Sequence, residues 1–179
     1  IYRSKDVSDS LALGKACFYL NRTNVSGILS GGVIGGLDQT GTYKMDARFN
    51  RKTLIAKIQR IEEYKDRIEV TNLDAEEFIT RRLTDSELFA YLDPPYVQKG
   101  PDLYRSSFTN EKHRSLARKI GSAQSKWVVT YDADVLIKSI YNDYEQSNLE
   151  IGYSANLKTV GKEKIILGPG LIWPASLKS

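Results

Sequence analysis

The sequence predicts an α/β fold with a mostly parallel sheet and an antiparallel strand pair near the C-terminus. Strand-like and helix-like segments alternate over most of the chain, which is typical of parallel strands joined by crossover helices. Residues 126–132, KWVVTYD, are rich in β-branched and aromatic residues and form the clearest strand. Two further strand candidates, 144–155 and 163–168, are separated only by a short basic connection, which favours an antiparallel pair.

The N-terminal part is expected to form two helices around a glycine-rich segment. Ser8 or Asp9 can cap a helix that runs to about residue 20, and Asn50 can cap a second helix to about residue 64. Four apolar residues of the second helix share one face: Leu54, Ile55, Ile58 and Ile61. Residues 21–50 show little periodicity, which predicts a functional or binding insertion.

The C-terminal part continues as alternating strands and helices. A strand is predicted at 67–73, followed by a short helix that Asp74 can cap, with Glu77 three positions on as in a capping box. Residues 88–92 form the next strand. Thr109 or Asn110 then begins a helix to about residue 120, with Leu116, Ala117 and Ile120 facing inward, and another helix covers about 133–142.

Composition permits a nucleic-acid partner without requiring one, because 179 residues carry a net charge of only +4 with a pI near 9.0. The single cysteine, Cys17, excludes an internal disulfide and fits a reducing, cytoplasmic compartment, where it would pack in the core. One histidine and one cysteine argue against a structural zinc site, and no metal is expected. No apolar run approaches the ~20 residues of a membrane span. The oligomeric state is left open, a monomer being compatible with the sequence.

The most informative motif is Asp93-Pro94-Pro95-Tyr96, which follows the apolar strand 88–92. Two prolines cannot continue a strand ladder, and ligands of open parallel sheets bind beyond the carboxyl ends of the strands. The Asp93 carboxylate and the Pro94 carbonyl can accept hydrogen bonds from a planar amine such as that of adenine, while Tyr96 offers a stacking face. The alternative is a proline-stiffened turn, with Asp93 bonding nearby amides and Tyr96 in the core.

The sequence resembles the Dam-like, adenine-specific DNA methyltransferases that use S-adenosylmethionine. The likeness extends in order over about residues 10–170. It includes FYLNRTNVSGI (18–28), GTYKMDARFNRKTLIAKI (41–58), RIEVTNLDAEEFI (67–79), the segment 93–117, WVVTYDAD (127–134) and YSANLKTVGKEKIIL (153–167). It implies a methyltransferase-like, Rossmann-like fold.

The resemblance also implies roles for individual residues. Asp93, Pro94, Pro95 and Tyr96 would be catalytic, and Asp74, Phe78 and Asp93 would contact the cofactor. The methyl group would pass directly to the amine of a flipped adenine, without a covalent enzyme intermediate. His113, at the start of a capped helix, is expected to be a surface or structural residue rather than a general base. The segment 98–107, with Tyr104, is expected to close over the flipped base.

A DNA-facing surface is expected in the glycine-rich region, where family members place target recognition. Its residues combine cations with hydrogen-bonding side chains, and the partner would be double-stranded DNA: Asn21, Arg22, Thr23, Asn24, Lys44, Arg48, Arg51 and, near the C-terminus, Lys158. The chain would then divide into a target-recognition region, 1–66, and the C-terminal part of a catalytic domain, 67–179.

The family also carries an upstream strand with a glycine loop and a second strand with an acid for the ribose, and neither occurs before residue 10. The chain is therefore expected to be an incomplete, weakly active part of a parent enzyme, incomplete at the N-terminus. Two alternatives stay open: a non-catalytic DNA-binding module derived from such an enzyme, or a methyltransferase acting on another planar amine. Asp93 counts against the second. A role in restriction–modification is also expected from the resemblance.

Overall fold

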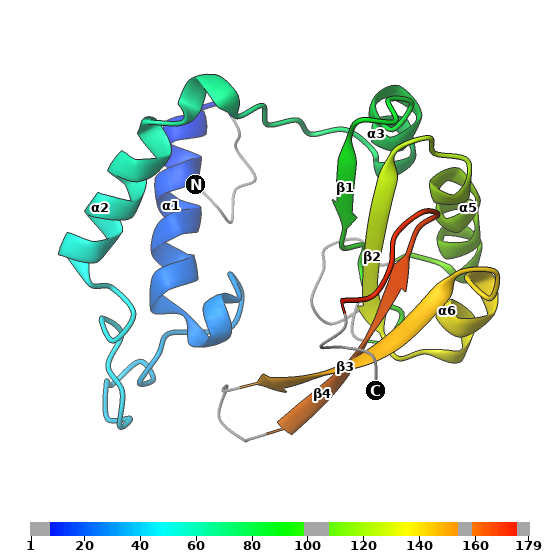
Figure 1. Ribbon diagram of the computed structural model, residues 1–179. Coiled ribbons are helices and arrows are strands. Elements are labelled where there is room, and N and C mark those ends of the chain that lie inside the picture. Colours follow the sequence, from blue (N-terminus) through cyan, green and yellow to red (C-terminus); the bar gives the residue numbers. More distant parts are fainter. Residues whose placement is uncertain (1–7, 99–107, 154–158, 175–179) are drawn as a thin grey trace. The chain divides into compact units, whose positions relative to one another are not determined.

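The computed structural model describes residues 8–98, 108–153 and 159–174 (Figure 1). The chain divides into two compact units, Ile1–Val70 and Thr71–Ser179, and each is described by itself. Among the described residues, no helix has the length and apolar character needed to cross a membrane.

The first unit consists of two helices and two short 3-10 turns: α1 (Ser10–Thr23), η1 (Val25–Gly27), α2 (Arg51–Glu62) and η2 (Lys65–Arg67). Both helices begin at predicted caps, since Asp9 accepts a hydrogen bond from the Ala12 amide at 2.9 Å and Asn50 accepts one from Thr53 at 3.0 Å. Helix α1 runs three residues further than expected. It ends at Asn24, whose backbone is extended.

The glycine-rich segment between α1 and α2 is held by turns rather than by long elements. Asn24 pairs with Val33 in an isolated bridge, and its side-chain amide donates to the carbonyls of Ile28 and Leu29 at 3.2 and 3.0 Å. Gly35 has φ of +87°, and a Cβ there would lie 2.6 Å from the Tyr43 carbonyl oxygen. Only glycine fits this position, because it tolerates both the left-handed backbone and the close approach.

The second unit is built on a four-stranded sheet with the order β1-β2-β4-β3. The strands are β1 (Phe89–Leu92), β2 (Lys126–Asp132), β3 (Glu145–Tyr153) and β4 (Thr159–Leu167). Strands β1 and β2 are parallel, whereas β4 is antiparallel to both β2 and β3. Three helices, α3 (Ala75–Arg82), α5 (Asn110–Gly121) and α6 (Val135–Ile140), lie on one side of the sheet (Figure 1).

The expectation of a mostly parallel sheet is wrong for the described residues, because only one of the three strand pairings is parallel. The strand predicted at 67–73 does not form. Its backbone is extended at Ile68, but no described strand pairs with it, and Val70 is 89% exposed. A strand needs a partner for its backbone groups, so extended conformation alone does not make one. The antiparallel pair at the C-terminal end is confirmed as β3 and β4.

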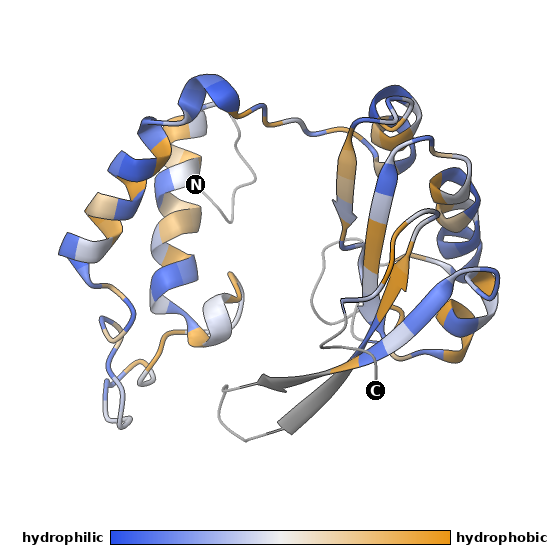
Figure 2. Ribbon diagram, in the orientation of Figure 1, coloured by the Kyte–Doolittle hydropathy of each residue, from blue (hydrophilic) through white to orange (hydrophobic). Residues whose placement is uncertain are grey.

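The core of the second unit lies between the sheet and the three helices. Alternation along β2 sends Trp127, Val129 and Tyr131 into this layer, where all three are fully buried. Leu116, Ala117 and Ile120 of α5 face them, as predicted from their spacing. Figure 2 shows hydrophobic residues along β1 and in the middle of β2, with hydrophilic residues on the helices' outer turns. The same alternation along β2 places Val128, Thr130 and Asp132 on the other face of the strand, which points away from the core.

Candidate functional site

A loop with two consecutive prolines leaves the carboxyl end of β1. Residues 93–98, called the DPPY loop from here on, begin with an exposed Asp93 and a buried Pro94. Since neither proline has an N–H, the ladder with β2 stops at Leu92, whose register partner is Val129. Asp93 thus stands at the end of a parallel strand, where open α/β sheets place their ligands.

A hollow of about 330 Å³ lies beside the DPPY loop. Its walls are mostly apolar and come from the loop, from β1 and from the two nearest helices. They include Leu92, Asp93, Pro94 and Pro95, together with Leu73, Phe78, Ile79, Phe108, Leu116 and Ile120. The volume is within the range of small-ligand pockets, and one carboxylate set among apolar walls is a common composition for such sites.

Strand β2 supplies the polar partners of the DPPY loop. Thr130 donates its hydroxyl hydrogen to Asp93 Oδ1 at 2.9 Å. Asp132 accepts two backbone hydrogen bonds, from the Val97 amide at 3.0 Å and from the Gln98 amide at 2.8 Å. Both β2 side chains are buried, at 6% exposure. Sequence reasoning missed these residues, although their i, i+2 spacing at the end of a strand was a signal that they share a face.

Asp74 caps α3 as predicted, accepting a hydrogen bond from the Glu76 amide at 2.9 Å. Its carboxylate also pairs with Lys112 Nζ at 3.2 Å. The Glu76 amide and the Lys112 ammonium lower the pKa of Asp74, and the hydrogen bond to Asp74 raises the pKa of Lys112. Asp74 is not among the residues lining the hollow, whereas Phe78, one helical turn further on, is.

Tyr96 is half-buried and packs against the edge of the core. It does not line the hollow of about 330 Å³, of which Asp93, Pro94 and Pro95 form one wall. The structure therefore brings three of the four predicted catalytic residues to the same hollow.

His113 was predicted to be either a surface or a structural residue, and its burial identifies it as structural. It is fully buried, and its Nδ1 lies 3.1 Å from the Tyr131 hydroxyl. Its ring also contacts the rings of Phe108 and Tyr131, with centroids 5.4 and 5.5 Å away. Burial lowers the pKa of His113, against the opposing charges of Asp132 and Asp134, so the imidazole is neutral in the fold near pH 7.

Several residues predicted to contact DNA make hydrogen bonds within the first unit. Thr23 and Asn24 are buried, with Thr23 Oγ1 donating to the Tyr19 carbonyl at 2.9 Å. Arg22 Nε donates to the Arg48 carbonyl at 3.2 Å, and Asn21 Nδ2 donates to the Gly27 carbonyl at 3.1 Å. Lys44 Nζ donates to the Gly41 carbonyl at 3.0 Å.

The other residues of the predicted DNA-facing surface, apart from the buried Thr23 and Asn24, differ in their exposure to solvent. Asn21, Lys44 and Arg51 are exposed, whereas Arg22 and Arg48 are half-buried. Lys158, Tyr104 and most of the segment 98–107 lie outside the described residues.

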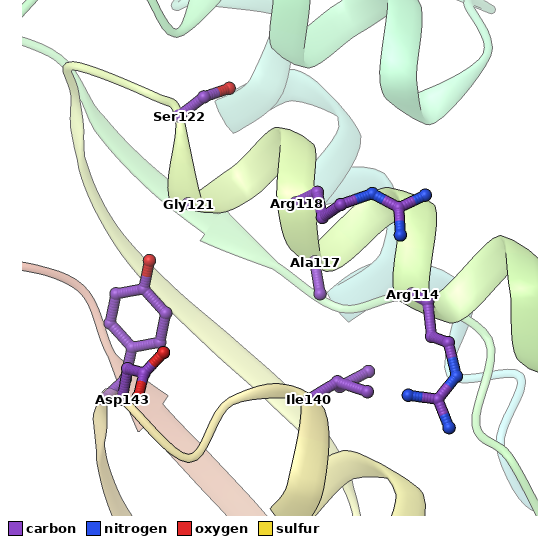
Figure 3. A pocket seen from close by; sticks show the side chains of 8 residues that line it. Arg114, Ala117, Arg118, Gly121, Ser122, Ile140 and Asp143 are labelled. Atoms are coloured by element: carbon purple, nitrogen blue, oxygen red, sulfur yellow. The ribbon is translucent and has the colours of Figure 1, made fainter.

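A second hollow, of about 530 Å³, lies along α5 (Figure 3), and its lining residues include none from the DPPY loop. Arg114 and Arg118 of α5 line one wall, and Ile140, Asp143 and Tyr144 line the other. None of the residues predicted for catalysis or cofactor binding borders it. The predicted site residues that line a hollow are thus found at the smaller one, beside Asp93.

Comparison with known proteins identifies the family of the chain. The family model described as D12 class N6 adenine-specific DNA methyltransferase matches residues 5–155. The chain is also similar to the Type II methyltransferase M.CviBI of Paramecium bursaria Chlorella virus NC1A, with 27% identity over 166 residues. That match covers 90% of this chain and 61% of the relative, so the chain spans less than two thirds of the relative's length. Because the family model covers most of the sequence, including the DPPY loop, the chain belongs to the D12 class of N6 adenine-specific DNA methyltransferases.

Proposed function

We propose that this chain forms the target-recognition and catalytic-loop portion of an enzyme that methylates the exocyclic amine of adenine in double-stranded DNA, with S-adenosylmethionine as methyl donor. The observation that carries the proposal is the placement of Asp93 and Pro94. The carboxylate and the prolines stand at the carboxyl end of a parallel strand, beside an apolar hollow of about 330 Å³.

The acceptors of the DPPY loop fit an aromatic amine. Such an amine has two N–H donors and a lone pair delocalised into the ring, so its nucleophilicity rises when fixed acceptors bind its hydrogens. Asp93 provides a carboxylate oxygen, and Pro94 provides a carbonyl outside any strand ladder. Tyr96 would stack on the ring of the flipped base. The two prolines limit backbone motion, so the acceptors need little ordering when the base arrives.

The hollow fits the adenosine part of the cofactor in size and polarity. Phe78, Phe108 and Leu116 offer apolar and aromatic contacts, and Asp93 borders the same space. Asp74 would contribute its carboxylate from the start of α3. When bound, S-adenosylmethionine supplies a methyl group on a sulfonium centre, and its transfer leaves a neutral thioether.

The transfer forms one N–C bond and breaks one S–C bond, and the amine then loses a proton. The residues of this chain contribute by orienting the amine with Asp93 and Pro94, and by excluding water with the apolar walls of the hollow. No nucleophilic side chain is needed. Cys17 has no role in this scheme.

The first unit would contact the DNA. Its exposed polar and cationic residues, among them Asn21, Lys44 and Arg51, suit phosphate contacts and base-edge contacts. The division into a recognition region, 1–66, and a catalytic region, 67–179, is part of this proposal. Thr23 and Asn24 would support that surface from inside, because they are buried and bonded to the main chain.

The test uses the full-length enzyme of which this chain is proposed to be a portion, DNA that lacks N6-methyladenine and a cofactor with a tritiated methyl group. Wild-type protein should label the DNA, and hydrolysis should yield N6-methyladenine. Asp93→Ala and Tyr96→Ala should each lower the rate at least about a hundredfold while DNA binding persists. Asp143→Ala, which removes an exposed carboxylate of the same unit beside the other hollow, is the matched control and should keep the rate.

Two outcomes would contradict the proposal. Unchanged turnover in both loop variants would remove Asp93 and Tyr96 from the reaction. DNA binding by the intact wild-type protein with no methyl transfer would favour the alternative, a non-catalytic DNA-binding module.

A further inference from the structure

We propose that Thr130 and Asp132 of β2 are positioning residues that hold the DPPY loop at both ends and select which oxygen of Asp93 faces the substrate. This inference rests on the proposed function and extends it, because it gives a positioning role to two residues outside the loop. Thr130 contacts the first residue of the loop and Asp132 contacts its last two.

The Thr130 contact fixes the carboxylate. A carboxylate only accepts hydrogen bonds, so the Thr130 hydroxyl must donate its one hydrogen to Asp93 Oδ1, 2.9 Å away. The Tyr91 hydroxyl, 3.1 Å from Thr130 Oγ1, must therefore donate to Thr130. This chain of two hydrogen bonds uses one lone pair of Asp93 Oδ1 and restrains rotation of the carboxylate. Oδ2, to which Thr130 does not donate, is then the oxygen that we expect to accept from an amine.

The Asp132 contact fixes the other end of the loop. Its two carboxylate oxygens each accept one backbone N–H, from Val97 at 3.0 Å and from Gln98 at 2.8 Å. The Gln98 side chain makes a third hydrogen bond at this end of the loop, because its Nε2 donates to Asp134 Oδ2 at 3.0 Å. Asp132 is only 6% exposed, and a buried carboxylate is costly unless it is hydrogen-bonded, so these two amides compensate for its burial.

The orientation of β2 separates these contacts from the core. Trp127, Val129 and Tyr131 point to the helices, whereas Thr130 and Asp132 alternate to the other face. Replacing Thr130 by a residue of similar shape therefore leaves the packed layer intact. Its effect should fall on the reaction, since a small misplacement of a reacting group costs far more in rate than in stability.

The first experiment compares Thr130→Val, which deletes the hydroxyl at nearly constant shape, with Thr130→Ser, which restores it. Thr130→Val should lower kcat about tenfold to a hundredfold while KM for DNA and for the cofactor change less than about twofold. Thr130→Ser should recover most of kcat. Ser125→Ala is the matched control, because Ser125 is equally buried and donates to the Asp85 carbonyl at 2.6 Å, far from the loop.

The second experiment reads loop order without relying on activity. Hydrogen exchange in Asp132→Ala should become faster at the Val97 and Gln98 amides than in wild-type protein, and stay unchanged in β4. Asp132→Asn, which keeps one acceptor oxygen, should give a smaller increase. In activity assays the two variants should rank in the same order, Ala lower than Asn.

The inference is overturned if Thr130→Val and Ser125→Ala lower kcat equally, if Thr130→Ser is no better than Thr130→Val, or if exchange at Val97 and Gln98 does not respond to Asp132→Ala. These failures differ from failure of the proposed function, in which wild-type protein itself transfers no methyl group. In that case the exchange experiment still decides whether Asp132 holds the loop.

Discussion

Among the residues that the structure describes, twelve hydrophobic side chains are buried in the second unit, Thr71–Ser179, whereas only Thr23 and Asn24 are buried in the first unit, Ile1–Val70. The second unit packs Trp127, Tyr131 and Tyr141 between a sheet and three helices. The first unit exposes even the apolar face of α2. The prediction that Leu54, Ile55, Ile58 and Ile61 share a helix face is compatible with α2, but Ile55, Ile58 and Ile61 are more than half exposed.

This difference matches the different tasks proposed for the two units. A loop that must present a carboxylate with sub-ångström accuracy needs a close-packed support, because packed interiors resist displacement. A surface that must follow the grooves of DNA can be polar and rich in glycine, since its final order can come from the partner.

Truncating one apolar side chain in each unit should give very different losses of stability. Trp127→Ala removes a fully buried indole whose ring lies 4.9 Å from that of Tyr144, and it should cost about 3–5 kcal/mol of unfolding free energy. Ile58→Ala, at a side chain 53% exposed, should stay within about 1 kcal/mol. Urea denaturation followed by circular dichroism measures both, and equal losses would remove the contrast.

The same substitution, glycine to alanine, should have opposite signs in the two units. A Cβ on Gly168 would lie 2.6 Å from the Trp127 ring, so Gly168→Ala should destabilise by about 1–3 kcal/mol. Gly14 lies inside α1 with nothing within 4 Å of an added Cβ, so Gly14→Ala should stabilise by about 0.5–1 kcal/mol. Denaturation midpoints moving in one direction for both variants would contradict this.

Stability should depend on pH through His113. Burial lowers its pKa in the fold, while the unfolded chain titrates near 6.5, so the unfolded state binds more protons as pH falls. This contribution to the free energy of unfolding is complete above about pH 7.5 and decreases below pH 6.5, by at most about 1.4 kcal/mol per pH unit. Denaturation from pH 8 to 5 should show a shallower slope for His113→Phe than for wild type, and parallel slopes would contradict the assignment.

The smallest effect is expected on DNA binding. Arg51 is exposed at the start of α2, so Arg51→Gln should lower the slope of log affinity against log salt concentration by about one, if it binds one phosphate. Lys119→Gln, which removes an exposed cation of α5 in the second unit, is the control and should leave the slope unchanged. Fluorescence anisotropy over a salt series measures both, and equal slopes for the two variants would contradict a DNA-facing first unit.

Much of the local structure could be predicted. Helix starts followed from capping residues, so Asp9, Asn50, Asp74 and Thr109 each accept the expected amide hydrogen bond. Strand β2 coincides with the predicted 126–132, because β-branched and aromatic residues favour a pleated, buried strand. The DPPY loop stops β1 where the prolines remove the ladder donors. For the site, the motif and the family resemblance together predicted roles for Asp93, Pro94 and Phe78, and all three line the hollow of about 330 Å³.

The features that follow from neighbouring residues along the chain could thus be predicted from the sequence: the caps, the break in β1 and the family to which the motif belongs. Tertiary structure alone decided that 67–73 stays unpaired, that β4 lies between β2 and β3, and that Thr130 bonds an aspartate 37 residues away. The difference arises from the sequence distance over which each kind of interaction acts. Backbone dihedral preferences and capping bonds act over a few residues, whereas strand pairing, burial and the partner of a hydroxyl depend on which distant segment arrives beside it.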